Sequence, residues 1–158
     1  MSERPRHQSL ALLLHRVRVL VRGQFQEVFR RFDLSEQQWR IMSALNTHGE
    51  MSVTEIADRC LISRPSVVGI IQRMEMLDYI CRTAHTNDKR KINISLSKKG
   101  GRLVAEAVPM MALAYKRIEV ILGKSTYKNL FAILEEAAKR LEPHDVRPHL
   151  NSWDWDKL

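Results

Sequence analysis

The stretch SRPSVVGIIQRME, residues 63–75, decides the fold of this chain. Ser63 suits the N-cap of a helix, and Pro65 suits its first turn because a backbone N–H at that position would have no partner in the helix. On one side of such a helix lie the apolar residues Val67, Ile70, Ile71, Met74 and Leu77. On the opposite side lie Pro65, Val68, Gly69, Gln72 and Met76, flanked by Arg64 and Arg73. The segment therefore predicts a surface helix, from Ser63 to about Asp78, whose second face is available to a partner.

Two further helix starts precede this segment. Ser35 is followed three residues later by Gln38, and Ser52 is followed in the same way by Glu55. Each pair is a capping box, in which the two side chains satisfy each other's backbone N–H groups. We expect one helix from Ser35 to near Gly49 and a short one from Ser52 to about Cys60.

A β-hairpin is predicted directly after the two-faced helix. Residues 79–86 and 91–96 are short strand-like runs, and in the second apolar residues alternate with polar ones. The intervening Asn-Asp-Lys-Arg, residues 87–90, supplies turn formers and charge. Helix, short helix, tight turn, two-faced helix and basic hairpin follow one another in the order of a winged helix-turn-helix. We expect that DNA-binding lobe over residues 35–96.

The outer parts of the chain read as amphipathic helices. Apolar residues recur at three-and-four spacing over residues 9–32, which predicts one long helix, and again over 101–141, with Gly123 as a stop and Ser125 as the next cap. Their apolar surface exceeds what the lobe needs to cover itself. We therefore expect a mainly α fold with a small β-hairpin wing, paired into an intertwined homodimer through its N- and C-terminal helices. Residues 1–158 form one expected domain, with the tail 142–158 left unassigned.

Composition narrows the function classes. The 158 residues carry 26 Lys and Arg against 18 Asp and Glu, a formal charge of +8, which favours a polyanionic partner. The apolar stretch from Leu10 to Val21 is interrupted by three basic residues, so we expect no membrane span, no signal peptide and a cytoplasmic protein. The histidines and cysteines show no metal-ligand spacing, and the chain has no nucleophile elbow, P-loop or dinucleotide fingerprint. We expect neither an enzyme nor a bound cofactor.

The exposed face of the two-faced helix offers the side chains that read a major groove. Arg64 suits guanine and Gln72 suits adenine, each through paired hydrogen bonds, and Val68 suits a thymine methyl group. Phosphate oxygens are the expected partners of a second set, because helix N-termini and arginine attract anions: Ser63, Ser66 and Arg73. Gly69, beside Pro65 on the same face, would let the backbone approach the DNA.

The chain resembles the MarR family of bacterial regulators from about residue 9 to residue 141. The likeness lies in LSEQQWRI at 34–41, SRPSVVGIIQRME at 63–75 and NDKRKINISLSKKG at 87–100, and is greatest to regulators of homoprotocatechuate and related aromatic-acid degradation operons. The last string holds an Asp-x-Arg wing signature as Asp88, Lys89 and Arg90. The resemblance implies that Arg90 enters a minor groove, that Asp88 orients the wing, and that a dimer binds double-stranded DNA with a pseudo-palindromic operator in the bacterial nucleoid.

The resemblance also implies repression that a small aromatic carboxylate or phenol relieves. The candidate ligand-binding residues are His15, Arg18, Trp39 and Arg40. Other interpretations stay open: Trp39 suits a core position equally well, and the two arginines could pair with acids such as Glu36. A redox switch through Cys60 or Cys81 would make the protein a cysteine-based redox-sensing repressor of the same fold. DNA binding without sequence preference would make it a non-specific DNA-binding protein instead.

Overall fold

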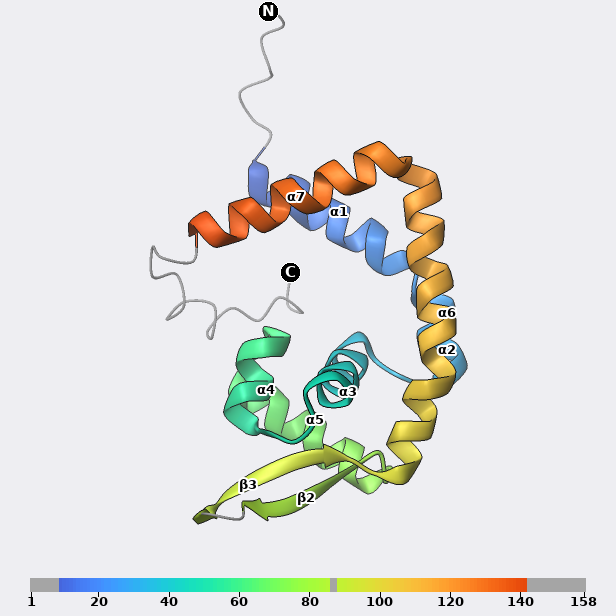
Figure 1. The fold of residues 1–158 in the computed structure, drawn as a ribbon. Coiled ribbons are helices and arrows are strands. Elements are labelled where there is room, and N and C mark those ends of the chain that lie inside the picture. The colour runs from blue at the N-terminus through green and yellow to red at the C-terminus, as the bar shows by residue number, and fades with distance from the viewer. Residues whose placement is uncertain (1–8, 86–87, 142–158) are drawn as a thin grey trace, which may run out of the picture.

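The fold, in a computed structural model that describes residues 9–85 and 88–141 apart from the side chains of 84–91, is mainly helical with a three-stranded sheet. The expected fold class, a mainly α fold with a β-hairpin wing, is confirmed (Figure 1). In chain order the elements are α1 Leu10–Gly23, α2 Gln26–Phe32, α3 Glu36–His48, β1 Met51–Ser52, α4 Val53–Cys60, α5 Arg64–Met76, β2 Ile80–His85, β3 Asp88–Leu96, α6 Lys98–Leu122 and α7 Lys124–Leu141.

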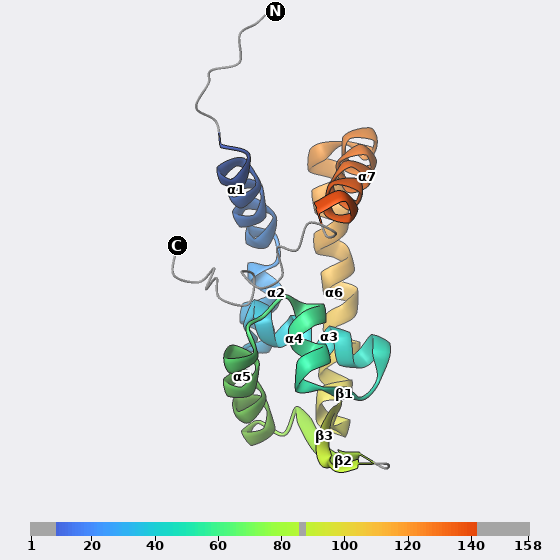
Figure 2. The same ribbon diagram turned by 90° about the vertical axis from the view of Figure 1, so that its left-hand side faces the viewer.

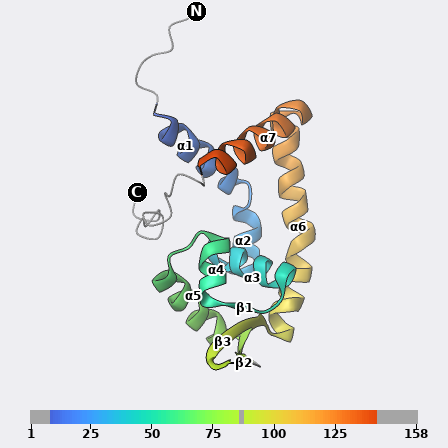
Figure 3. The ribbon, with the colours of Figure 1, turned by 60° about the vertical axis from the view of Figure 1, so that its left-hand side comes forward.

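Helix α6 runs between the two ends of the molecule. At one end it begins beside the β2–β3 hairpin, and at the other it leads into α7, near the level of α1 (Figures 1 and 2). Helices α3, α4 and α5 gather toward the hairpin end, as a third view also shows (Figure 3). The α5–hairpin unit and the α1–α7 end are therefore separated along α6.

The predicted caps form as expected. Gln38 N donates to Ser35 Oγ at 3.1 Å, and Ser35 N donates to Gln38 Oε1 at 2.8 Å. The Ser52–Glu55 pair makes the same reciprocal bonds at 3.3 and 2.8 Å. Both capping boxes are confirmed, and they fix where α3 and α4 begin.

The sheet has the strand order β1-β3-β2, and both pairings are antiparallel. The predicted hairpin is confirmed and pairs Ile80 with Leu96 and Thr83 with Asn93, but β3 begins at Asp88, so residues 88–90, which were expected in the turn, belong to the strand. Strand β1, which pairs Met51 with Ile94, was not expected, because two residues are too short to show an alternation. The sheet thus fastens the wing to the turn before α4.

Three predicted helix boundaries are wrong. The helix expected over 9–32 is broken between Gly23 and Gln26, where Gln24 N and Phe25 N donate to carbonyls only three residues back, each at 3.0 Å. Helix α6 begins at Lys98, before residue 101, because Ser97 Oγ accepts from Gly100 N at 2.9 Å. Helix α7 begins at Lys124, so Ser125 lies inside its first turn and does not cap it.

The core consists of two clusters. The larger one fills the space among α3, α4, α5, the sheet and the start of α6, with Ile41, Ile56, Ile71 and Met74 almost fully buried. The smaller one joins α2 to the middle of α6 through residues such as Phe25 and Met111. Helices α1 and α7 contain no buried residue at all. The hairpin end is therefore packed within one chain, whereas the other end is not.

Candidate functional site

Helix α5 has the two faces that the sequence predicted. Val67, Ile70, Ile71 and Met74 are buried against the larger core cluster. The opposite face exposes Arg64, Pro65, Ser66, Val68, Gln72 and Arg73, with Gly69 half-buried. Leu77, expected on the buried side, is 44% exposed because α5 ends at Met76 and Asp78 turns the chain away with a φ of 57°.

Ser63 and Ser66, two residues predicted to hold phosphate, lie together at the N-terminus of α5. Ser63 Oγ accepts from Ser66 N at 3.4 Å and donates to Ser66 Oγ at 2.8 Å. The two serines predicted to hold phosphate are thus joined, and the Ser66 hydroxyl can still donate its own hydrogen outward. Gly69 lies one turn further along, and nothing stands within 4 Å of where a Cβ would be. The helix backbone can be approached closely there.

The wing is described in part. Asp88, Lys89 and Arg90 begin β3, but their side chains lie outside the described residues. Their predicted contacts with the minor groove and with each other stay predictions. The base of the wing is held by Glu50, whose Oε2 accepts from Thr83 Oγ1 at 3.3 Å and from Asn93 Nδ2 at 3.5 Å.

The end of α5, the hairpin and the start of α6 are fastened together. Ser97 Oγ donates to Asp78 O at 2.6 Å, and Lys99 Nζ donates to Leu77 O at 2.7 Å. Gly100 packs directly on the carbonyl of Tyr79, where a Cβ would lie only 2.0 Å from the oxygen. This junction holds α5 in a defined position relative to α6.

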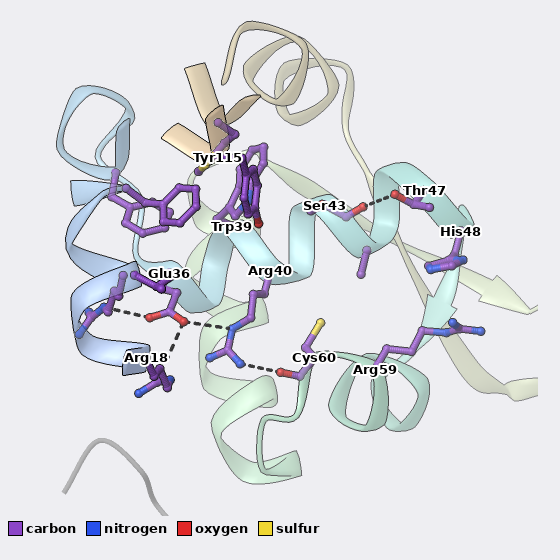
Figure 4. A pocket seen from close by; sticks show the side chains of 16 residues that line it. Arg18, Glu36, Trp39, Arg40, Ser43, Thr47, His48, Arg59, Cys60 and Tyr115 are labelled. Atoms are coloured by element: carbon purple, nitrogen blue, oxygen red, sulfur yellow. Dashed lines mark hydrogen bonds and ion pairs between the residues drawn. The ribbon is translucent and has the colours of Figure 1, made fainter. Parts of the chain in front are cut away.

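A cavity of about 460 Å³ lies among α1, α2, α3, α4 and α6. Three of the four predicted ligand residues, Arg18, Trp39 and Arg40, line it, whereas His15 does not (Figure 4). The other lining residues are Val21, Arg22, Phe25, Phe29, Glu36, Ser43, Ala44, Thr47, His48, Arg59, Cys60, Met111 and Tyr115. Three residues that were predicted to share a site, one from α1 and two from α3, therefore lie at one cavity.

Glu36 lies at the centre of the charged part of this cavity. Its carboxylate is 2.9 Å from Arg22 Nε, 3.5 Å from Arg18 Nη2 and 3.9 Å from Arg40 Nε. The alternative that Arg18 and Arg40 pair with Glu36 is therefore confirmed. One carboxylate cannot neutralise three guanidinium groups, however, so this cluster keeps a surplus of about two positive charges.

Arg40 also reaches across to α4. Its Nη1 donates to the carbonyl of Cys60 at 2.8 Å. Its Nε is buried and makes no hydrogen bond among the described residues, because Glu36 is too far away for one. Arg40 therefore contacts both sides of the cavity and retains one buried donor that has no acceptor among the described residues.

Burial controls the ionisation of two further groups at the cavity. It raises the pKa of the Cys60 thiol, and the positive charge of Arg40 opposes this without cancelling it. Burial, with a smaller contribution from Tyr127, also raises the pKa of Tyr115. Both groups are therefore neutral at pH 7, and the neutral thiol is the form that resists oxidation. Cys81 is exposed in β2, with its Sγ 3.1 Å from Ser95 Oγ.

Sequence reasoning missed Arg22 and Tyr115 as cavity residues. Arg22 stands four positions after Arg18, so the one-turn spacing could have placed both on the same helix face. Tyr115 comes from α6, ninety positions after Phe25 in the chain, and packs edge-on against the Phe25 ring with ring centroids 4.8 Å apart. No local pattern joins those two rings.

The described residues contain neither a membrane-spanning helix nor a cluster of metal ligands. None of the helices within 9–85 and 88–141 is long and apolar enough to cross a membrane. The same residues contain no group of three His, Cys, Asp or Glu side chains arranged to hold a metal ion.

A capped short helix and a tight turn lead into a helix that exposes an Arg and Gln face, and an antiparallel hairpin is fastened to that helix. These features define a DNA-binding winged-helix regulator. The MarR family model matches residues 34–92. The chain is also 36% identical over 130 residues, 82% of this chain and 88% of the relative, to the homoprotocatechuate degradative operon repressor of Escherichia coli. The chain therefore belongs to the MarR family of transcriptional regulators and is not an enzyme.

Solved structures agree with this assignment. NadR in complex with 4-hydroxyphenylacetate matches with a TM-score of 0.72 and 29% identity, over 88% of this chain and 99% of that one. The transcriptional repressor CouR bound to a 23-mer DNA duplex matches with a TM-score of 0.77 and 25% identity, over 87% and 99%. The fold is thus one that is found both with an aromatic acid and on DNA.

Proposed function

We propose that this protein represses an operon for the breakdown of an aromatic compound and is released from DNA by a small aromatic acid or phenol. The observation that carries the proposal is the cavity between α1 and α3, with its surplus of positive charge beside aromatic walls. The E. coli relative, which represses a homoprotocatechuate degradative operon, supports the same substrate class.

The cavity suits an aromatic acid in size and chemistry. About 460 Å³ lies within the range of small-molecule sites. Arg18, Arg22 and Arg40 can bind a ligand carboxylate as well as the carboxylate of Glu36. Charge-assisted hydrogen bonds to guanidinium groups are among the strongest available. Trp39 and Tyr115 provide ring surfaces, and the raised pKa of Tyr115 keeps its hydroxyl as a donor. His15 lies on α1 away from the lining and is not part of this proposal.

The α5 face and the wing are the proposed DNA contacts. In this proposal Arg64 and Gln72 read base edges, and Val68 meets a thymine methyl group. Ser63, Ser66 and Arg73 hold phosphates beside Pro65 and Gly69. Asp88 orients the wing, Lys89 contacts the DNA, and Arg90 enters the minor groove. The exposure of the α5 face supports the first two sets, and bound DNA would place the protein on the nucleoid.

A homodimer completes the proposed regulator. Helices α1 and α7 expose many large apolar side chains, among them Leu10, Leu12, Leu20, Phe131, Ile133 and Leu141. Exposed apolar surface of this extent is typical of an interface and not of a monomer. Two copies of α5 would then enter successive major grooves roughly 34 Å apart, which requires a pseudo-palindromic operator.

Titration calorimetry with 4-hydroxyphenylacetate tests the effector site. Arg18→Ala and Arg40→Ala should each raise the Kd about tenfold or more, because each removes a charged hydrogen-bond donor. Arg30→Ala, an exposed arginine of α2 that does not line the cavity, should leave the Kd unchanged. Equal affinity in all three variants would eliminate the proposed effector site.

Gel shifts with DNA from upstream of the gene test the other half of the proposal. The protein should bind this duplex far more tightly than a random one, whereas a coater of DNA would show a small difference and a steep salt dependence. The acid should weaken specific binding. Loss of binding with peroxide, restored by dithiothreitol, would favour the redox switch instead.

A further inference from the structure

Arg40 joins the cavity to the start of the recognition helix. Its Nη1 donates to the Cys60 carbonyl at 2.8 Å, and Cys60 is the last residue of α4. The carbonyls at a helix C-terminus have no partner within the helix. The Arg40 guanidinium therefore supplies from α3 the hydrogen bond that the end of α4 lacks.

The residues after Cys60 form a tight connection into α5. Leu61 takes a left-handed conformation with a φ of 50°, and Ile62 N donates back to Ala57 O at 3.1 Å. Ser63 then caps α5. Only two residues separate the carbonyl held by Arg40 from the N-cap of the helix that presents Arg64. A movement of this carbonyl is therefore passed to α5 with little chain to absorb it.

The other side of the same guanidinium group faces Glu36. Arg40 Nε is buried, 3.9 Å from Glu36 Oε1, and without a hydrogen-bond acceptor among the described residues. A carboxylate that displaces Glu36 would stand beside Nε and accept its hydrogen bond at a proper distance, which the Glu36 carboxylate does not do. The ligand would pull the planar group toward itself, and Nη1 would move with it because the five donors are rigidly connected.

We propose that Arg40 couples effector binding to DNA binding: an anionic effector draws its guanidinium group away from the Cys60 carbonyl and so frees the α4–α5 turn. This inference rests on the proposed function, because it requires a carboxylate in the cavity. Arg18 and Arg22 approach the same Glu36 carboxylate from α1. They give the effector charge to bind, whereas Arg40 transmits the binding.

Conservative substitutions test whether Arg40 transmits effector binding to the α4–α5 turn. Arg40→Lys keeps the positive charge, but a single ammonium group cannot hold Glu36 and the Cys60 carbonyl together as a planar fork does. Arg30→Lys makes the same change at an exposed arginine of α2 that does not line the cavity. Each variant is titrated with upstream DNA, with and without saturating 4-hydroxyphenylacetate, so that a change in probe affinity does not enter the result.

In the wild type and in Arg30→Lys the probe should weaken DNA binding about tenfold or more, in the usual range of allosteric coupling. In Arg40→Lys the effect should fall below about twofold, although calorimetry still detects the probe. Coupling that survives in Arg40→Lys overturns this inference and leaves the proposed function intact. A wild type that shows no response to the probe overturns both.

Hydrogen exchange in the ligand-free protein provides a second readout. Ile62 N–H and Val67 N–H are bonded on either side of the turn, to Ala57 O and Ser63 O. Arg40→Lys should speed their exchange about tenfold or more, while Arg30→Lys leaves it unchanged. Equal protection in all three proteins would show that Arg40 does not hold this turn. A variant that failed to fold would lose protection throughout the larger core and would be recognised by that.

Discussion

The hairpin end and the α1–α7 end of this molecule are built in opposite ways. Near the hairpin, α5 buries four residues almost completely and is capped at its start by Ser63. At the other end, α1 and α7 bury none, although both carry rows of leucine, valine or isoleucine. The proposed DNA-binding surface is complete within one chain, whereas the other end leaves exposed the apolar side chains that the proposed homodimer would cover.

The two regions also differ in whether their arginines make ion pairs. Arg64 and Arg73 on α5 make no ion pair among the residues that the structure describes, whereas Arg18, Arg22 and Arg40 share Glu36. An arginine that must bind phosphate or a base gains nothing from a competing carboxylate nearby. An arginine in a partly buried cavity needs one, because an unpaired charge there is costly. In the proposed function, the effector carboxylate would compete with Glu36 for these arginines.

The largest expected effect comes from breaking the junction between these regions. Gly100→Ala places a Cβ 2.0 Å from the backbone oxygen of Tyr79. Neither group is a flexible side-chain end that can move aside, so the free energy of unfolding should fall by about 3 kcal/mol. Urea unfolding followed by circular dichroism measures the loss.

The neighbouring glycine provides the matched control. Nothing lies within 4 Å of a Cβ at Gly101, in the same turn of α6. Gly101→Ala should leave stability unchanged or raise it by about 0.5–1 kcal/mol, as expected for glycine replaced within a helix. Equal losses in both variants would mean that the junction is not as tight as the structure has it.

A smaller effect should separate the two regions functionally. Arg64→Ala removes an exposed side chain from α5, so stability should change little while DNA binding weakens by about 1–3 kcal/mol and loses preference at one base position. Its affinity for 4-hydroxyphenylacetate should stay as in the wild type. Gel shifts against a set of single-base variants of the upstream DNA measure this.

Lys124→Ala is the control, since it removes an exposed cation at the start of α7, at the opposite end of the molecule. It should not alter base preference. An Arg64→Ala protein with unchanged preference would contradict the assignment of α5 as the reading helix.

How much the sequence predicts also differs between the regions. Ser35, Ser52 and Ser63 each specify a helix start through partners three residues away, so local patterns were enough to place α3, α4 and α5. The break after Gly23 was not predicted because the three-and-four spacing of apolar residues continues through it. The turn is fixed instead by Phe25, which is buried against α6.

The cavity was predictable only in part for the same reason. Arg18 and Arg40 could be proposed from residue type, and Glu36 as their partner from charge. The contact between Arg40 and the Cys60 carbonyl joins residues twenty positions apart through a backbone oxygen, which has no signature in the sequence. Long-range contacts of this kind decide the site, and they come only from the packed structure.

The smallest expected effect tests whether the α5 face is shaped for DNA more than for stability. A Cβ at Gly69 would meet nothing within 4 Å, and glycine within a helix costs about 0.5–1 kcal/mol relative to alanine. Gly69→Ala should therefore raise the free energy of unfolding by that amount. If the backbone meets DNA there, the same methyl group should weaken binding to the upstream duplex by a few-fold. Thermal unfolding and gel shifts on one preparation measure both changes. A more stable protein with unchanged DNA affinity would show that the backbone at this position does not approach the duplex.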